Sequence, residues 1–276
     1  MELGISSLGF IIELGLSNPF QDIHDLLYKS TKACLDFAEE RSISIVELVI
    51  DPPEIQKVEK RGQYVNLINN YSIKKQIHGP FIDVNLCSHN NLISKASLEI
   101  YMQTAKFCKE INAKIMTIHP GLANSMLKTI QDYNKNQLKY SIEELLDFTS
   151  KYNLIICIEN MTKQAGIMLD EINIKEIFSY INHNDLYLTY DTSHFYTNNG
   201  NIELLWKIFN AKIKNVHLVD NFTKESDTHP QLGIGKINFK EIFDVMKSYY
   251  YDGPLIIELS SAKDLDRSLN FINKFL

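Results

Sequence analysis

The stretch "LYLTYDTSH", residues 186–194, carries the pattern that decides the fold. A short run rich in apolar, aromatic and β-branched residues is typical of a buried strand, and here it gives way to Asp191 and His194. Seven further runs of this kind recur along the chain. They are "ELGISSLG" from Glu2, "SISIVELVI" from Ser42, "KKQIHG" from Lys74, "AKIMTIHPG" from Ala113, "LIICIEN" from Leu154, "IKNVHLVD" from Ile213 and "PLIIEL" from Pro254.

Segments with the three- and four-residue apolar spacing of helices separate these runs. Examples begin at Ser97, Ser141, Asn201, Phe239 and Asp264, and we expect Asn201 and Asp264 to cap their helices. Apolar strands alternating with helices indicate a buried parallel sheet. Eight such units favour an α/β fold in which residues 1–276 form a single (β/α)8 TIM barrel, with an open sheet of similar length as the alternative. In a barrel, the active site lies at the C-terminal ends of the strands.

Composition limits the classes of partner. The chain has 276 residues, a net charge of −6 and a pI of about 5.8, which argues against a general electrostatic hold on nucleic acid or anionic lipid. Its four cysteines form no CxxC pair, and no apolar run approaches the ~20 residues of a membrane span. We therefore expect a soluble, cytoplasmic protein with no membrane partner, for which an oligomer is possible.

Ionisable residues end six consecutive predicted strands. These residues are His78, His119, Glu159, Asp191, His217 and Glu258, and His194, Asp227 and His229 follow shortly after strand ends. One such histidine is usually an ordinary core or loop residue. Closure of a barrel, however, would turn all six strand ends towards one pocket, where clustered carboxylates repel each other unless a cation compensates them. Histidine with carboxylate ligands suits zinc, manganese, iron or cobalt better than calcium.

The ordered series "IHGPFIDVNL", "TIHPG", "CIENM", "YDTSH", "VHLVD", "DTHPQLGIGKINF" and "PLIIEL" resembles the xylose isomerase-like TIM-barrel superfamily. That superfamily includes sugar phosphate isomerases and epimerases as well as endonuclease IV. The resemblance covers essentially the whole chain. No single motif is specific, but the series in this order is.

The resemblance implies a ligand set for one to three divalent ions (Zn, Mn or Co) per chain. One ion would be held by Glu159, Asp191, His217 and Glu258. A second would take His78 and His119 and share Glu159, and a third would take His194, Asp227 and His229. Asp191 would end its strand and His194 would lie in the loop beyond it, so the two would serve neighbouring ions. Asp220 and Asn160 are candidates for supporting hydrogen bonds to the ligands.

Two enzymatic functions follow from the resemblance, and we favour the first. A sugar or sugar-phosphate isomerase or epimerase would use Glu159 and Glu258 as catalytic residues that move a proton on and off carbon. The alternative is an endonuclease IV-like zinc phosphodiesterase that acts at apurinic or apyrimidinic sites of DNA. A barrel that has lost activity and only binds is a third possibility, which the unused buried charge argues against.

The two enzymatic functions predict different surroundings for the metals. The nine ligand positions favour the nuclease. Against it, "VELVIDPPEI" and "SSLGFIIELGL" are neutral to acidic where a DNA-binding loop would be basic, and the lysines of "SIKKQIHG" lie at the wrong end of their strand. The glycines of "QLGIGKINF" fit either a backbone approach to phosphate or sugar, or a tight turn. Phe81, Phe195 and Tyr196 fit either the pocket lining or packing at the rim.

Overall fold

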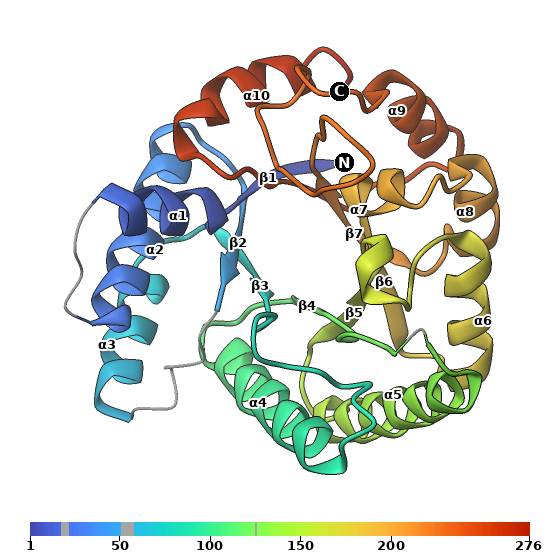
Figure 1. The fold of residues 1–276 in the computed structure, drawn as a ribbon. Helices are drawn as coiled ribbons and strands as arrows, with labels where there is room; N and C mark the ends of the chain where they lie inside the picture. The colour runs from blue at the N-terminus through green and yellow to red at the C-terminus, as the bar shows by residue number, and fades with distance from the viewer. Residues whose placement is uncertain (18–21, 51–57, 125) are drawn as a thin grey trace.

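The strands of this protein close into one parallel barrel in a computed structural model that describes residues 1–17, 22–50, 58–124 and 126–276. Figure 1 views the barrel along its axis, with the strands inside a ring of helices. Each strand pairs in parallel with the next, and β8 pairs with β1, which confirms the predicted (β/α)8 fold. The strands are β1 (Glu2–Ser6), β2 (Ile45–Val49), β3 (Lys74–His78), β4 (Ile115–Ile118), β5 (Ile155–Glu159), β6 (Leu186–Asp191), β7 (Ile213–Leu218) and β8 (Pro254–Ile257).

Helices follow every strand. In the described residues these are α1 (Leu8–Ser17), α2 (Ile23–Glu40), α3 (Val58–Asn69), α4 (Asn91–Glu110), α5 (Lys128–Thr149), α6 (Glu171–Ile181), α7 (Thr192–Thr197), α8 (Ile202–Phe209), α9 (Phe239–Ser248) and α10 (Leu265–Ile272). Two of them, α1 and α7, come directly after β1 and β6 and precede the helices that complete those units. Both extra helices therefore start at the C-terminal face of the barrel. Among the described residues, no helix is both long and apolar enough to cross a membrane.

The apolar core lies between the strands and the surrounding helices. β2 is buried along its whole length, as expected for a strand covered on both faces. Trp206 of α8 is fully buried and contacts the rings of Tyr190 and Tyr251. Burial of this apolar surface on the outer face of the sheet holds the barrel closed, so that the interior can carry other residue types.

The barrel interior contains a polar layer instead of the branched apolar side chains that usually fill it. Asn215 Nδ2 donates to Glu47 Oε2 at 2.9 Å and to Thr117 Oγ1 at 3.2 Å, and Gln76 Nε2 donates to Asn215 Oδ1 at 3.1 Å. Thr117 in turn shares a 2.8 Å hydrogen bond with Thr189. All five side chains are buried. Because buried polar groups are costly unless they are paired, this network supports the site that lies above it.

The helix boundaries differ from the predicted ones in two places. α4 begins at Asn91 instead of Ser97, and α5 begins at Lys128 instead of Ser141, because residues 91–96 and 128–140 mix polar and apolar side chains without a clear apolar period. Asn201 caps α8 as expected, with its side chain accepting from Leu204 N at 3.0 Å. Asp264 occupies the N-cap position of α10 as expected, but its side chain makes no capping hydrogen bond.

The three sequence stretches that argued against a nuclease have different outcomes. Residues 51–55 of "VELVIDPPEI" lie outside the described residues. The stretch after β1 is not the loop that we expected but mostly helix α1, because its apolar residues include a helical face. Lys74 lies at the N-terminal end of β3, where its Nζ is 2.6 Å from Glu2 Oε1. It is therefore at the end of the strand away from the candidate site, as expected.

Candidate metal centre

The structure brings the nine predicted ligand residues together at the C-terminal face of the barrel. Eight of them form three groups in which one candidate ligand atom from each residue lies within 4.8 Å of the others, and the first two groups share Glu159. The groups are His78 with His119 and Glu159, Glu159 with Asp191 and His217, and His194 with Asp227 and His229. Glu258, which the resemblance assigns to the central ion, falls instead into a further group with His217 and Glu47.

Glu159 lies at the centre of the site, and its two oxygens face different imidazoles. Oε2 is 2.9 Å from His119 Nε2 and 3.3 Å from His78 Nε2. Oε1 is 3.0 Å from His217 Nδ1 and 3.6 Å from His194 Nδ1. Glu159 is buried at the end of β5. Its carboxylate therefore belongs to two ligand groups at once, one on each oxygen.

Strand register places the central residues. Asp191 of β6 is the register partner of His217 of β7, so the two side chains emerge at the same height. Asp191 Oδ2 is 3.9 Å from His217 Nδ1. On its other side, His217 Nε2 is 2.8 Å from Glu47 Oε1, and both side chains are fully buried. His217 thus has one ring nitrogen towards the ligand cluster and the other towards a carboxylate of the polar layer.

The third group surrounds Asp227. Its Oδ2 is 2.7 Å from His229 Nε2 and 3.1 Å from His194 Nε2, and its Oδ1 accepts from Ser193 Oγ at 2.5 Å. We expected His194 in a loop, but it lies in the short helix α7. Asp191 caps this helix by accepting from His194 N at 2.6 Å. The three-residue spacing of "DTSH" is therefore the spacing of an N-cap, and it directs the two side chains into neighbouring ligand groups.

Hydrogen bonds fix several of these imidazoles from behind. His78 Nδ1 contacts the Gly79 carbonyl at 2.8 Å, and His194 Nδ1 contacts the Asn160 carbonyl at 2.9 Å. The Asn160 side chain also bonds the backbone of Asp191 in both directions, at 2.8 and 3.0 Å. Such bonds orient the opposite ring nitrogen, Nε2, towards the pocket. Asn160 therefore supports the ligand residues as we expected from the sequence.

Asp220 has a different role from the expected one. Its Oδ2 accepts from Gly233 N at 2.9 Å and from Gly235 N at 2.8 Å, and its Oδ1 accepts from Ile237 N at 3.2 Å. The glycines of "QLGIGKINF" thus form a turn around a buried carboxylate. Because their N–H groups already donate to Asp220, they are not available to a phosphate or a sugar.

The charges of the cluster are strongly coupled. Burial disfavours the ionised form of Glu159, but the charge of His217 and hydrogen bonds from His119, His217 and His78 hold its pKa well below the ordinary value. Burial also opposes protonation of His78, yet the hydrogen bond and charge of Glu159 raise its pKa to about 9. Burial raises the pKa of Asp191 to about 7. For Glu159 and His78, the opposite charge of the partner therefore outweighs the loss of hydration on burial.

Three polar atoms test whether the site fits a cation. Asp191 Oδ2, Glu258 Oε2 and His229 Nδ1 are buried, and none of them has a hydrogen-bond partner. A buried polar atom without a partner is costly, and two of these three belong to carboxylates that would be ionised when bound to a cation. Imidazole and carboxylate donors within a few ångströms of each other suit zinc, manganese or cobalt. The residues present therefore fit the implied ions.

Sequence reasoning missed Glu47. It lies in the middle of "SISIVELVI", where a carboxylate inside an apolar strand was the only available signal. Burial disfavours its ionised form, but the charge and hydrogen bond of His217 hold its pKa below the ordinary value. Glu47 therefore adds a buried negative charge directly beneath the ligand cluster.

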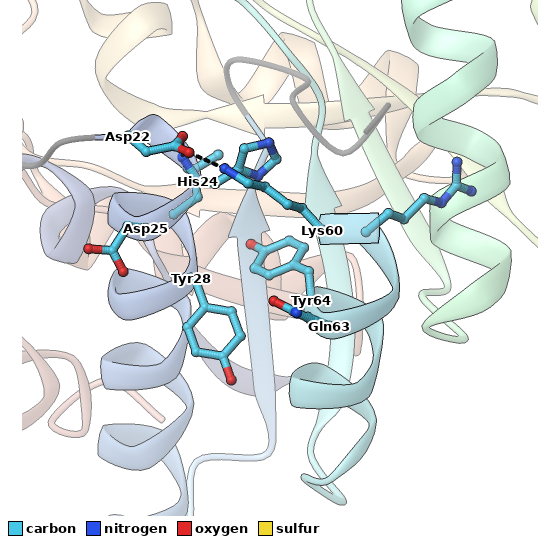
Figure 2. A pocket seen from close by; sticks show the side chains of 9 residues that line it. Asp22, His24, Asp25, Tyr28, Lys60, Gln63 and Tyr64 are labelled. Carbon is cyan, nitrogen blue, oxygen red and sulfur yellow. Dashed lines mark hydrogen bonds and ion pairs between the residues drawn. The ribbon is translucent and has the colours of Figure 1, made fainter. Parts of the chain in front are cut away.

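A cavity of about 500 Å³ opens above the ligands. Phe81 lines it, with its ring centroid 5.3 Å from that of His78 and 5.6 Å from that of His119. Phe195 is buried and packs on Tyr190 instead. Figure 2 shows a second hollow, between α2 and α3, where Lys60 pairs with Asp22. Its described lining contributes no residue to the ligand groups, so it is not a candidate site.

A closed parallel barrel whose strand ends gather histidines and carboxylates defines a class of TIM-barrel protein with a candidate metal site at this face. The chain belongs to the xylose isomerase-like TIM-barrel family, whose sequence profile matches residues 21–275. It is 31% identical to the uncharacterised protein MJ1614 of Methanocaldococcus jannaschii over 90% of this chain and 94% of that protein. It is 22% identical to a probable endonuclease 4 of Aquifex aeolicus, over 75% of this chain and 78% of the relative.

Solved structures share the same fold. The crystal structure of a D-tagatose 3-epimerase-like protein matches with a TM-score of 0.81 and 22% identity, and the match covers all of this chain and 97% of the other. A D-allulose 3-epimerase from Methylomonas sp. matches with a TM-score of 0.77 and 14% identity, over 100% and 97% of the two chains. Sugar epimerases are therefore structural neighbours, while endonuclease 4 proteins are among the sequence relatives. Both predicted functions stay within this family.

Proposed function

We propose that this protein is a metal-dependent hydrolase of phosphoester bonds with a polynuclear centre. The observation that carries the proposal is the position of Glu159, whose Oε2 faces His78 and His119 while Oε1 faces His217. A carboxylate arranged in this way is suited to bridge two cations. From the sequence alone we had favoured a sugar isomerase or epimerase, so this proposal reverses that order.

The surroundings of Glu159 disfavour a role as a proton carrier. A base that removes a proton from carbon needs an oxygen free to reach the substrate and a pKa near the working pH. Both oxygens of Glu159 are engaged by imidazoles, and hydrogen bonds and charge keep its pKa well below the ordinary value. A bridging carboxylate in a hydrolase needs neither property, since its task is to hold charge in place.

The residues of the site divide into three sets in this proposal. His78 and His119 would hold one ion with Glu159, and Asp191 and His217 would hold the next. The third set comprises His194, Asp227 and His229, and Glu258 offers its unpartnered Oε2 to the central ion. Bound divalent cations would supply the positive charge that activates water and neutralises a phosphoester. The polypeptide would orient the imidazoles through Asn160 and Gly79 and keep bulk water out through burial.

A sugar isomerase or epimerase is the second candidate, and Glu258 favours it. Its Oε2 is buried without a hydrogen-bond partner, and the cavity of about 500 Å³ is large enough for a small molecule. Two lysines of the βα loops are also paired with acids, Lys163 with Glu225 at 2.5 Å and Lys263 with Glu13 at 3.0 Å. Such pairing weakens the hold on a DNA backbone, so a small substrate suits both candidates.

Metal content and activity together test the proposal. Elemental analysis of protein purified without added metal should give two or three divalent ions per chain, and the protein should hydrolyse bis(p-nitrophenyl) phosphate. His119→Ala should remove about one ion and most of the activity, whereas His89→Ala, at an exposed histidine outside the ligand groups, should change neither. One ion per chain together with epimerisation of a ketose would refute the proposal in favour of the second candidate. Cleavage of an oligonucleotide with an abasic site would extend it to DNA.

A further inference from the structure

The cavity above the ligands has an apolar wall. Apart from the ligand residues, its described lining comprises Leu8, Ile11, Ile12, Val49, Phe81, Ile82 and Thr162. We call the first six the apolar wall. Thr162 supplies the one side-chain hydroxyl of this described lining, and neither lysine nor arginine occurs in it. The described lining of the cavity therefore combines the predicted metal ligands with hydrocarbon side chains.

Helix α1 provides half of this wall through a second apolar face. Leu8, Ile11 and Ile12 recur at the spacing of one helical face and stay partly exposed. Phe10 points elsewhere, because it is buried with its ring 5.8 Å from that of Phe37 in α2. A helix that only covers its neighbour needs a single apolar face. The additional face of α1 is left to the cavity.

The loop after β3 provides another part of the wall. Phe81 lies beside the imidazoles of His78 and His119, and Ile82 is 68% exposed. The hydrocarbon surface therefore continues from the ligand cluster to the mouth of the cavity. A substrate held at the cluster would have its remaining atoms against this surface.

We propose that the substrate joins a metal-binding oxyanion to an apolar group, an alkyl or aryl chain that packs between α1 and the Phe81–Ile82 segment. This inference rests on the metal centre of the proposed function and names its substrate class. Hydroxyl groups of a sugar would face the apolar wall with only Thr162 as a side-chain partner outside the ligand set, and buried hydroxyls without partners are unfavourable. A hydrocarbon group in the same place removes apolar surface of both molecules from water.

A series of alkylphosphonates tests the inference on the zinc-loaded protein. Binding of methyl-, propyl- and butylphosphonate is measured by calorimetry, with inorganic phosphate as the reference. Each buried methylene should tighten binding about four-fold, which gives roughly 60-fold between the methyl and butyl compounds. Affinity that does not depend on chain length would overturn the inference. If neither inorganic phosphate nor any phosphonate binds, the result would also contradict the metal centre of the proposed function.

Variants locate the effect on the apolar wall. Ile82→Asn and Ile12→Asn should each reduce the dependence on chain length several-fold while leaving the affinity for inorganic phosphate unchanged. Ile82 is largely exposed, so its replacement should not disturb folding. Leu16→Asn is the matched control, because Leu16 lies one turn beyond Ile12 on α1, is 84% exposed and is not part of the wall. An equal loss of chain-length dependence in Leu16→Asn would contradict the assignment.

Discussion

Replacement of Glu47 by glutamine should weaken metal binding at the central group without unfolding the protein. Glu47 Oε1 lies 2.8 Å from His217 Nε2, and His217 Nδ1 faces Glu159 at 3.0 Å. Asn215 Nδ2 also approaches His217 Nε2, at 3.1 Å, but its two hydrogens are directed to Glu47 and Thr117. Glu47 Oε1 lacks the geometry of a full hydrogen bond, but its charge at 2.8 Å favours a proton on Nε2. That contact leaves the lone pair of Nδ1 for a cation.

The expected size of the effect follows from this geometry. Removal of the hydrogen-bond partner behind a metal-binding histidine typically weakens metal affinity about 10- to 100-fold, which corresponds to about 1.4–2.7 kcal/mol. Glutamine keeps the shape of Glu47 and can still bond to Gln76 and Asn215. It removes one partner of a buried charge pair with His217, so the metal-free protein should stay folded but melt at a lower temperature.

Zinc competition against a chelator measures the affinity, and the visible spectrum of the cobalt-substituted protein reports the ligand geometry. Thr189→Val is the matched control, because Thr189 lies in the same polar layer and bonds to Thr117 rather than to His217. This control should lower the melting temperature but leave the affinity for the most tightly bound zinc ion unchanged. A zinc affinity of Glu47→Gln within two-fold of the unmodified protein, with an unchanged cobalt spectrum, would refute the reasoning.

Three further predictions concern the site and its support. Asp191→Asn should lose an ion and all activity while circular dichroism shows an intact fold, and retained activity would remove Asp191 from the ligand set. Zinc affinity should rise as pH increases towards 9, because the pKa of His78 is raised from 6.5 to about 9 and the ligand stays protonated below that pH. The same raised pKa stabilises the metal-free fold: the contribution is complete below pH 6.5 and is lost as pH rises through 9. Zinc titrations that are flat with pH would contradict this. Gly235→Ala should lower stability by roughly 1–3 kcal/mol in thermal melts, because its Cβ would lie 2.2 Å from Asp220 Oδ1, and an unchanged melting temperature would show that the turn adapts.

Local patterns in the sequence were sufficient for the fold. Eight apolar runs predicted eight strands, and a polar ending on each of six strands indicated where the site lies. The pattern failed where helix signals are weak, as in the first turns of α4 and α5. It also failed at α1, whose apolar residues fit either a loop that covers the barrel or a helix.

The sequence was less informative about the chemistry of the site. It placed Glu159 and Glu258 as equivalent proton carriers. The structure distinguishes them, because both oxygens of Glu159 face imidazoles whereas Glu258 Oε2 has no hydrogen-bond partner. Their different surroundings depend on which side chains other strands bring close, and no local pattern records that.

By itself, the sequence determined the residue types at the strand ends and hence the class of ligand chemistry, because strand periodicity and residue identity are local properties. Only the tertiary structure decided which side chains lie beside one another, and it groups Glu258 with His217 and Glu47. Closure of the barrel places Glu47 of β2 beneath His217 of β7, two residues far apart in the chain. It also turns a second apolar face of α1 towards the ligand cavity. Both contacts arise because parallel strands and their following helices meet at one end of a closed sheet, whatever their separation along the chain.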